Sequence, residues 1–236
     1  MDDRKLERHF ISAIIPAAGQ GTRMKASINK QYLTLKGKPI LSYTLEVFEN
    51  CPLIDEIVVV INENEQAIFR RQILSQGHFS KIKIAFGGAS RQESVYKGLK
   101  QANPKCDLVL IHDGARPLIN SDLILRCIYE TLQHHATIVA VPAKNTIKVV
   151  NDRGKVEYTP NRKNLYEVQT PQSFDYGLIM KAHEKAIEES AEATDDAALV
   201  ERMGETVSIV KGHYNNLKIT TPEDLVIASS IIAVMR

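Results

Sequence analysis

Short apolar runs alternate with segments of helical periodicity between residues 11 and 141. The runs are rich in β-branched residues and almost continuously apolar, which is typical of strands covered on both faces. In chain order they are ISAII, EIVVVI, KIKIAF, DLVLIH and TIVAV. In the segments between them, apolar residues recur three or four positions apart, as in Val95, Leu99 and Ala102. The alternation predicts an α/β fold, a mostly parallel sheet with helices on both faces.

The pattern changes between residues 142 and 166. The pieces TIKVV and KVEYT flank the turn sequence NDRG, which indicates a β-hairpin. The segment as a whole is polar on both faces and contributes little to a core, and a hairpin surrounded by water is only marginally stable by itself. We therefore predict a projecting β-hairpin arm, at about residues 142–166, that lies against another surface; a second subunit is the candidate.

Regular elements resume after the arm. We expect helices near residues 176–190 and 195–203, then the strand TVSIVK, and a last helix capped by Thr221 with Pro222 in its first turn. No internal repeat or linker interrupts the sequence. Residues 1–236 are therefore predicted to form a single domain that carries the arm.

Composition narrows the class of protein. Thirty basic residues against 28 acidic ones give a net charge of +2, which argues against a dedicated nucleic-acid binder. No stretch approaches the ~20 apolar residues that span a membrane, and the charged N-terminus does not resemble a signal peptide. Three cysteines lack metal-ligand spacing, which indicates reduced thiols and a cytoplasmic location. They are Cys51, Cys106 and Cys127.

The strongest chemical signal follows the first predicted strand, in the sequence PAAGQGTRM. A glycine-rich turn at this end of a parallel strand lies where such folds bind ligands, and its backbone N–H groups can approach phosphate oxygens. A dinucleotide-binding turn would need a third glycine where Met24 stands, and the Gly-Lys-Ser/Thr of a P-loop is absent. Gly19 and Gly21 with the cations Arg23 and Lys30 indicate a triphosphate site, although a tight turn without ligand would also use two glycines.

A second candidate is the sequence IHDGARP, in which Asp113 follows the fourth predicted strand. A carboxylate at this edge can hold Mg²⁺ that bridges phosphates, whereas a helix cap or turn would use an aspartate equally well. A metal phosphohydrolase would need further histidines on helices. The adjacent His134 and His135 cannot share a helical face, so we expect them to be solvated.

Six motifs follow one another along the chain: PAAGQGTRM with Lys30, GGASRQESV, HDGARP, YEVQTPQSF, TDDAALVE and NNLKITTPEDL. Together they resemble the 2-C-methyl-D-erythritol 4-phosphate cytidylyltransferase family of non-mevalonate isoprenoid biosynthesis. The resemblance runs from about Ile11 to Ser229. It implies a Rossmann-like nucleotidyltransferase fold and a homodimer in which the arm hooks the partner. The implied reaction transfers a cytidylyl group from CTP to a polyol phosphate with Mg²⁺, or another divalent cation, and releases pyrophosphate.

The resemblance also implies roles for individual residues. The group expected to bind the nucleotide consists of Ala17, Ala18, Gly19, Gly21, Gly88 and Ser94. The cations expected to take part in catalysis are Arg23, Lys30, Arg162 and Lys218. The residues expected on the side of the polyol phosphate are Asp113, Arg116, Thr146, Arg162 and Lys218. Asp113 would also lie near the metal, while Thr146 and Arg162 would reach from the arm into the neighbouring subunit's site.

Such a reaction needs no protein base. A phosphate monoester has a second pKa near 6, so its attacking oxygen is already ionised at neutral pH. Catalysis then consists of alignment and the cancellation of charge. This accounts for candidate residues that are arginine, lysine and aspartate rather than a histidine or a serine nucleophile.

Other functions stay open at this point. The sister family of ribitol-5-phosphate cytidylyltransferases has the same chemical groups; Pro160-Asn161-Arg162 resembles that branch, and Asn29 stands where proline is common. The sequences at 17–19 and 113–117 favour the methylerythritol enzymes. A non-catalytic nucleotide-binding module would leave the arm cations without a role. A related glycosyltransferase would need an Asp-x-Asp pair, which the chain lacks.

Overall fold

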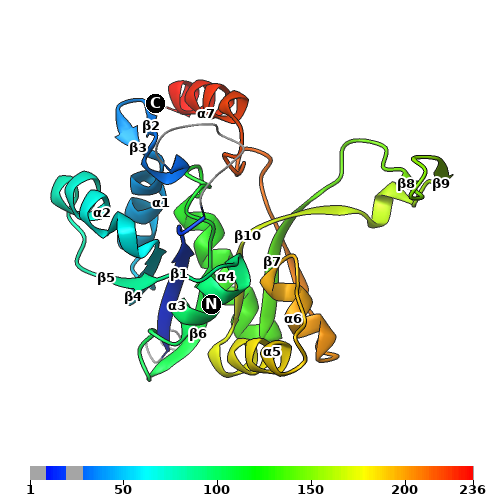
Figure 1. Cartoon of the computed structure of the whole chain (residues 1–236), viewed down its shortest axis with the longest axis horizontal. Helices are drawn as coiled ribbons and strands as arrows, with labels where there is room; N and C mark the ends of the chain where they lie inside the picture. The colour runs from blue at the N-terminus through cyan, green and yellow to red at the C-terminus, as the bar shows by residue number, and fades with distance from the viewer. Residues whose placement is uncertain (1–8, 20–28, 236) are drawn as a thin grey trace.

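A seven-stranded sheet forms the centre of the molecule (Figure 1). The computed structural model describes residues 9–19 and 29–235. The strand order is β11-β7-β10-β6-β1-β4-β5, and only β10 runs antiparallel to its neighbours. The bounds are β1 Phe10–Pro16, β4 Glu56–Ile61, β5 Ile82–Phe86, β6 Cys106–Ile111, β7 Ala136–Pro142, β10 Tyr166–Asp175 and β11 Ser208–Lys211. The predicted mostly parallel sheet is confirmed.

Helices cover both faces of the sheet. They are α1 Ile40–Glu49, α2 Gln66–Gln72, α3 Arg91–Leu99, α4 Ser121–His134, α5 Tyr176–Glu188 and α6 Asp196–Arg202. The last helix, α7 Pro222–Met235, packs instead in a separate small core with Ile40 and Ile219. Alternate residues of β1 enter opposite cores: Ile15 joins the core under α1, α2 and α4, whereas Ile14 joins the core under α3, α5 and α6. The continuous apolar runs in the sequence reflect this burial on both sides.

Some local predictions differ from the structure. The sequence ENEQAIFRRQILSQG predicts a helix closed by Gly77, but α2 ends at Gln72 and a 3₁₀ turn, Leu74–Gln76, follows it. Gly77 has extended backbone with φ −131°, so it is not a left-handed helix cap. A small hairpin of β2 Thr34–Leu35 and β3 Lys38–Pro39 was not predicted, because two-residue strands leave no periodicity.

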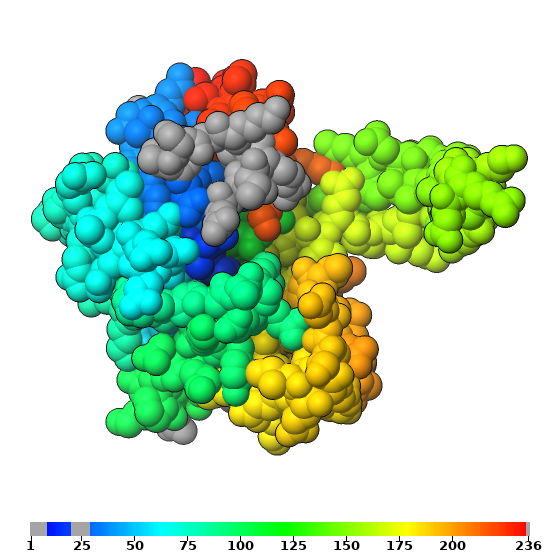
Figure 2. All heavy atoms as spheres, in the orientation of Figure 1, coloured from blue at the N-terminus to red at the C-terminus, as the bar shows by residue number. Residues whose placement is uncertain are grey.

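The segment 142–166 projects away from the sheet (Figures 1 and 2). Its tip holds the predicted hairpin, in which β8 Val149–Val150 pairs antiparallel with β9 Val156–Tyr158. Large apolar side chains are exposed along the arm and the adjoining start of β10: Ile147, Val150, Val156, Tyr158, Tyr166 and Val168.

The helices in the described part of the chain are too short or too polar to span a membrane.

One helix approaches the sheet unusually closely. Gly98 of α3 lies over β1 and β4, and a Cβ built on it would stand 2.7 Å from a methyl group of Ile14 and 2.7 Å from one of Val60. Real Cβ contacts are essentially never that short, so the residue must lack a side chain for α3 to pack at this distance. The position of α3 matters because this helix and the turn before it form part of the site described below.

We expect Gly98→Ala to lower the free energy of unfolding by about 1–3 kcal/mol, because the overpacked methyl groups must move. In an uncrowded helix the same change is favourable by about 1 kcal/mol. Gly177→Ala in α5 is the matched control, since a Cβ there meets nothing within 4 Å. Denaturant titrations compare the two variants, and an equal effect of both would contradict the close approach.

Candidate active site

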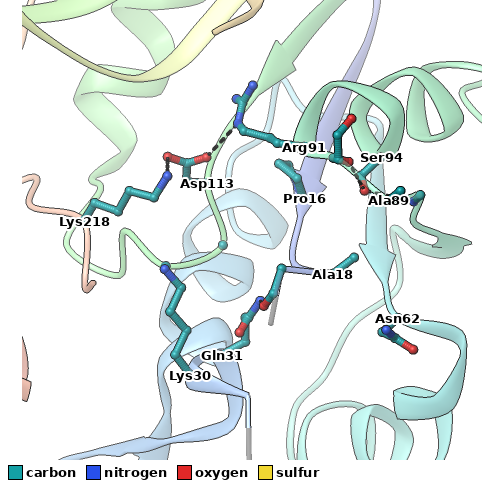
Figure 3. A pocket seen from close by; sticks show the side chains of 15 residues that line it. Pro16, Ala18, Lys30, Gln31, Asn62, Ala89, Arg91, Ser94, Asp113 and Lys218 are labelled. Carbon is teal, nitrogen blue, oxygen red and sulfur yellow. Dashed lines mark hydrogen bonds and ion pairs between the residues drawn. The ribbon is translucent and has the colours of Figure 1, made fainter. Parts of the chain in front are cut away.

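A cavity of about 470 Å³ lies at the carboxyl ends of β1, β4 and β6 (Figure 3). This edge is where open parallel sheets bind ligands. The loop after β1 supplies one wall, the turn before α3 the opposite one, and the loop after β6 the floor. The lining residues used below are Ala18, Gly19, Lys30, Gly88, Ser94, Asp113 and Lys218, together with Gln31 and Arg91.

The loop after β1 is fixed by a buried side chain. Gln31 is 3% exposed, and its Nε2 donates hydrogen bonds to the carbonyl oxygens of Ala17 and Gly19. The backbone N–H of Ala17 donates to the Val60 carbonyl at 2.7 Å. The described start of the glycine-rich loop is therefore held in place by the following segment and by β4. Gly21 and Arg23 lie outside the described residues.

The opposite wall is organised around the start of α3. Ser90 caps the helix by accepting a hydrogen bond from the Glu93 N–H at 3.0 Å. The Gly88 N–H donates to Ser94 Oγ at 3.0 Å. A Cβ on Gly87 would stand 2.5 Å from the Ala18 Cβ, so this glycine lets the two walls meet.

Three cations surround the carboxylate of Asp113. Lys218 Nζ lies 2.9 Å from Oδ2, Arg91 Nε 3.4 Å from Oδ1 and Arg116 Nε 3.5 Å from Oδ2. The first two contacts are drawn in Figure 3. The Asp113 side chain is only 10% exposed, and its backbone N–H donates to the Thr170 hydroxyl at 3.0 Å. The site thus pairs one buried anion with three cations.

Burial and charge act in opposite directions on the pKa of Asp113. Burial alone would raise it, but the neighbouring charges of Lys218, Arg91 and Arg116 outweigh that effect and lower the pKa well below its usual range. Asp113 is therefore ionised at neutral pH. The adjacent His112 is uncharged at neutral pH, because burial lowers the pKa of its imidazole to about 4.

A second cavity, of about 310 Å³, lies on the other side of this cluster. It shares Arg91, Asp113 and Lys218 with the first cavity. Its wall is completed by Arg116, by residues of β10 and by the turn before α6: Val168, Gln169, Thr170, Gln172, Thr194 and Asp195. The arrangement offers two polar sites for two ligands, separated by one anion and its cations.

Lys30 is one of the residues that line the first cavity (Figure 3). Its Nζ donates to the Ile219 carbonyl at 3.0 Å, which links the segment after the glycine-rich loop to the loop that carries Lys218. That loop is also tied to the one after β6, because Ile219 N–H donates to Ala115 O at 2.8 Å and Arg116 Nη1 to Asn216 O at 2.8 Å.

The structure brings most of the predicted residues together. The first cavity is lined by Ala18, Gly19, Lys30, Gly88, Ser94, Asp113 and Lys218, and the second adds Arg116. Ala17 is buried behind the loop. Thr146 and Arg162 are different, since both are exposed on the arm and line neither cavity. Arg162 Nη1 donates to the Lys144 carbonyl at 3.0 Å.

Comparison with known proteins gives a consistent family. The family model for 2-C-methyl-D-erythritol 4-phosphate cytidylyltransferase matches residues 11–234. A curated protein of that name from Geobacter metallireducens is 51% identical over 226 residues, which cover 94% of this chain and 97% of the relative. Another, from Alkaliphilus oremlandii, is 46% identical and covers 95% of this chain and 96% of the relative. The chain belongs to this cytidylyltransferase family.

A solved structure of the family has the same fold. The 4-diphosphocytidyl-2C-methyl-D-erythritol synthase of Anaerococcus prevotii superposes with a TM-score of 0.88 at 37% identity, covering 98% of this chain and 99% of that one. The predicted resemblance is therefore confirmed, and with it the nucleotidyltransferase fold. The comparisons favour the methylerythritol family over the ribitol branch.

Sequence reasoning about this cytidylyltransferase missed three contributors. Arg91 stands inside the quoted motif GGASRQESV, where a cation directly after a helix cap was the available signal. Gln31 follows Lys30, and the sequence offered no signal for its role. A buried glutamine that donates hydrogen bonds to backbone carbonyls cannot be distinguished by sequence from a glutamine on the surface. Asp196, the second aspartate of TDDAALVE, accepts from Arg91 Nη2 at 2.8 Å.

We expect Asp113→Asn to lower the free energy of unfolding by about 3 kcal/mol at neutral pH, because the three cations lose their shared carboxylate. The stabilisation by Asp113 is complete above the unfolded-state pKa of about 3.9 and is lost as the pH falls towards the lower folded-state pKa. The difference between wild type and variant should thus be constant at neutral pH and shrink below about pH 4. Denaturant titrations across this range measure it.

Asp122→Asn is the control, because Asp122 is 74% exposed in its pair with Arg126 and should contribute little at any pH. A difference for Asp113→Asn that stays the same in acid would show that its ionised form does not stabilise the fold.

Proposed function

We propose that the chain transfers the cytidylyl group of CTP to the phosphate of 2-C-methyl-D-erythritol 4-phosphate and releases pyrophosphate. Membership of the family supports this reaction. The observation that carries it is the pair of cavities that meet at Arg91, Asp113 and Lys218. Two anionic substrates can be brought together there, with cations at their junction.

In this proposal CTP occupies the first cavity. The loop of Ala17, Ala18 and Gly19, continued by Gly21, would wrap the triphosphate, because backbone N–H groups bind phosphate oxygens. Gly88 and Ser94 on the opposite wall would meet the cytosine and ribose. The Ser94 hydroxyl already accepts from Gly88 N–H and donates to Ser90 O at 2.8 Å, so its orientation is fixed before any ligand binds.

The polyol phosphate would occupy the second cavity, with Lys218 and Arg116 near its phosphate. Its oxygen attacks the α-phosphorus of CTP, a new P–O bond forms, and the bond to the β-phosphate oxygen breaks to release pyrophosphate. No protein base is needed, because the substrate phosphate is ionised near pH 6 and above. His112 is unsuited to that role, since the pKa of this buried imidazole is lowered to about 4 by desolvation.

Charge cancellation would supply the main part of the rate enhancement. The two substrates repel each other, and negative charge builds up on the phosphoryl oxygens and the leaving pyrophosphate. Lys30 and Lys218 line the first cavity, and Arg23 is assigned to the same task by its place in the motif. Fixed cations of this kind need no rearrangement at the moment of reaction.

We also propose that the reaction depends on Mg²⁺ or another divalent cation. Asp113 is ionised and is the only carboxylate among the described residues that line the first cavity. Mg²⁺ in such sites is typically bound through one or two carboxylates together with substrate phosphates, so this residue set fits an ion that arrives with CTP. When bound, the ion would neutralise charge on the triphosphate.

The arm would complete the site of a second subunit. Its exposed apolar side chains, such as Val156 at 57% and Tyr158 at 56%, are suited to burial against a partner. Thr146 and Arg162 line neither cavity of their own chain, which leaves a neighbouring site as their place of action. We therefore propose a homodimer with composite sites, working in the cytoplasm, where its buried free cysteines would remain reduced.

Turnover with defined substrates tests the proposed reaction. Purified protein receives Mg-CTP with 2-C-methyl-D-erythritol 4-phosphate or with ribitol 5-phosphate, and pyrophosphate release is measured. We expect rapid release with the first substrate only, loss of activity on chelation of the metal, and recovery on return of Mg²⁺. Release with neither polyol phosphate would refute the proposed transfer, and faster release with ribitol 5-phosphate would reassign the substrate.

Mixed dimers test the composite site. Lys30→Ala and Arg162→Ala should each lower kcat by roughly 10²–10³-fold as homodimers, because each removes a cation from the transition state. In a mixed dimer, the Arg162→Ala subunit keeps Lys30 and receives an intact Arg162 from its partner. Random reassembly makes about half the dimers mixed, so about a quarter of all sites should be whole.

Activity of the co-refolded mixture should therefore rise towards that fraction of wild type. The control is each variant refolded alone, which should show no rise. If mass spectrometry confirms mixed dimers and activity stays at the level of the single variants, Arg162 acts within its own subunit.

A further inference from the structure

Arg91 connects two carboxylates that lie on different elements. Its Nε faces Asp113 Oδ1 at 3.4 Å, at the junction of the two cavities, and its Nη2 donates to Asp196 Oδ2 at 2.8 Å. Asp196 is the first residue of α6 and is 1% exposed. The shorter contact of the arginine is thus the one with Asp196, which lines neither cavity.

Asp196 is itself held from several directions. Its backbone N–H and that of Ala197 donate to Oε1 of Gln172, at 3.0 and 3.1 Å. Gln172 belongs to β10 and also donates to Asp195 Oδ2 at 2.8 Å. On the other side, His183 Nε2 lies 3.4 Å from Asp196 Oδ1 and is fully buried. The backbone of Asp196 is therefore anchored to the sheet, and its carboxylate lies between Arg91 and the α5 residue His183.

This buried carboxylate is not among the residues that line either cavity. Burying an ion pair costs desolvation energy, and apolar residues of similar volume often stabilise a fold as well or better. Stability alone therefore gives no reason for an aspartate here. The contact with Arg91 is a reason for an aspartate at this position, because Arg91 lines both cavities.

We propose that Asp196 is a positioning residue for the cytidylyl transfer, holding the Arg91 guanidinium so that Asp113 and Lys218 keep fixed places between the two ligands. The inference rests on the proposed function and adds a residue to its machinery. Asp196 acts through Arg91 and does not touch either substrate. Without it, the guanidinium has one carboxylate partner left and can rotate about its side-chain bonds.

The charges of the cluster predict a distinctive kinetic result. Three cations, Arg91, Arg116 and Lys218, face two carboxylates, which leaves a net charge of +1. Asp196→Asn keeps the size of the side chain and makes the net charge +2. Anions should then bind at least as tightly as before, while the alignment of the reacting groups is lost.

We expect Asp196→Asn to lower kcat by roughly 10–100-fold, as misplacement of about 1 Å does in other enzymes, without raising KM for the polyol phosphate. Arg91→Lys keeps the positive charge but cannot bridge two carboxylates with one ammonium group. The double variant should be no slower than the slower single variant, because both changes break the same link. An unchanged kcat in Asp196→Asn, or losses that multiply in the double variant, would overturn the proposal.

Thr131→Ala is the control for general destabilisation. Thr131 is fully buried, and its hydroxyl is hydrogen-bonded to Cys127 O and Thr137 Oγ1. These hydrogen bonds do not involve the arginines or the carboxylates of the cluster. It should lower the free energy of unfolding but leave kcat near wild type. If it lowers kcat as much as Asp196→Asn does, the role of Asp196 is only structural.

A binding measurement separates this proposal from the proposed function. Calorimetry with inorganic phosphate needs no turnover, and we expect Asp196→Asn to bind phosphate at least as tightly as wild type. Weaker binding would overturn the positioning role. If wild type forms no cytidylylated product, the proposed reaction fails, whereas the phosphate result still tests whether Asp196 controls the charge at Arg91.

Discussion

The buried carboxylate of Asp113 is the group on which the site depends. An isolated anion in this place would be costly, and three cations in the same space would repel one another, so each charge is tolerated only because the others are present. The loops after β6, around Lys218 and at the start of α3 are therefore bound to one another electrostatically. The same cluster separates the two cavities, so the arrangement that holds these loops together also sets where two ligands can meet.

Much of the fold follows from the order of apolar runs. The five runs up to residue 141 correspond to β1, β4, β5, β6 and β7. Strands buried on both faces leave a continuous apolar signal, and the edge strand β5, which is partly exposed, leaves a weaker one. β10 was the harder element: it contains Pro171 and polar residues such as Gln172, and it runs antiparallel between two other strands. The predicted end of α2 was wrong for a different reason: a 3₁₀ turn follows the helix, and Gly77 does not cap it.

Some residues of the site could likewise be predicted from the sequence, and others could not. Glycines and the aspartate after strand ends could be predicted, because the topology of a parallel sheet brings those positions to one edge. Gln31 and Asp196 could not, since their importance comes from contacts between distant segments that no local pattern records. Thr146 and Arg162 were assigned by resemblance alone, and neither residue lines one of the two cavities of its own chain.

The ten residues of β10 contribute both to the base of the arm and to the wall of the second cavity. Its first part, Tyr166–Val168, pairs with the end of β7 at the base of the arm, and its next part supplies Gln169, Thr170 and Gln172 to the wall of the second cavity. The register shifts between Val168 and Gln172, at the border of the two parts. A change in the tilt of the arm would therefore also move one wall of the second cavity. One continuous stretch of backbone thus sets both the direction of the arm and the shape of the second cavity, so a substitution that alters one of them also alters the other.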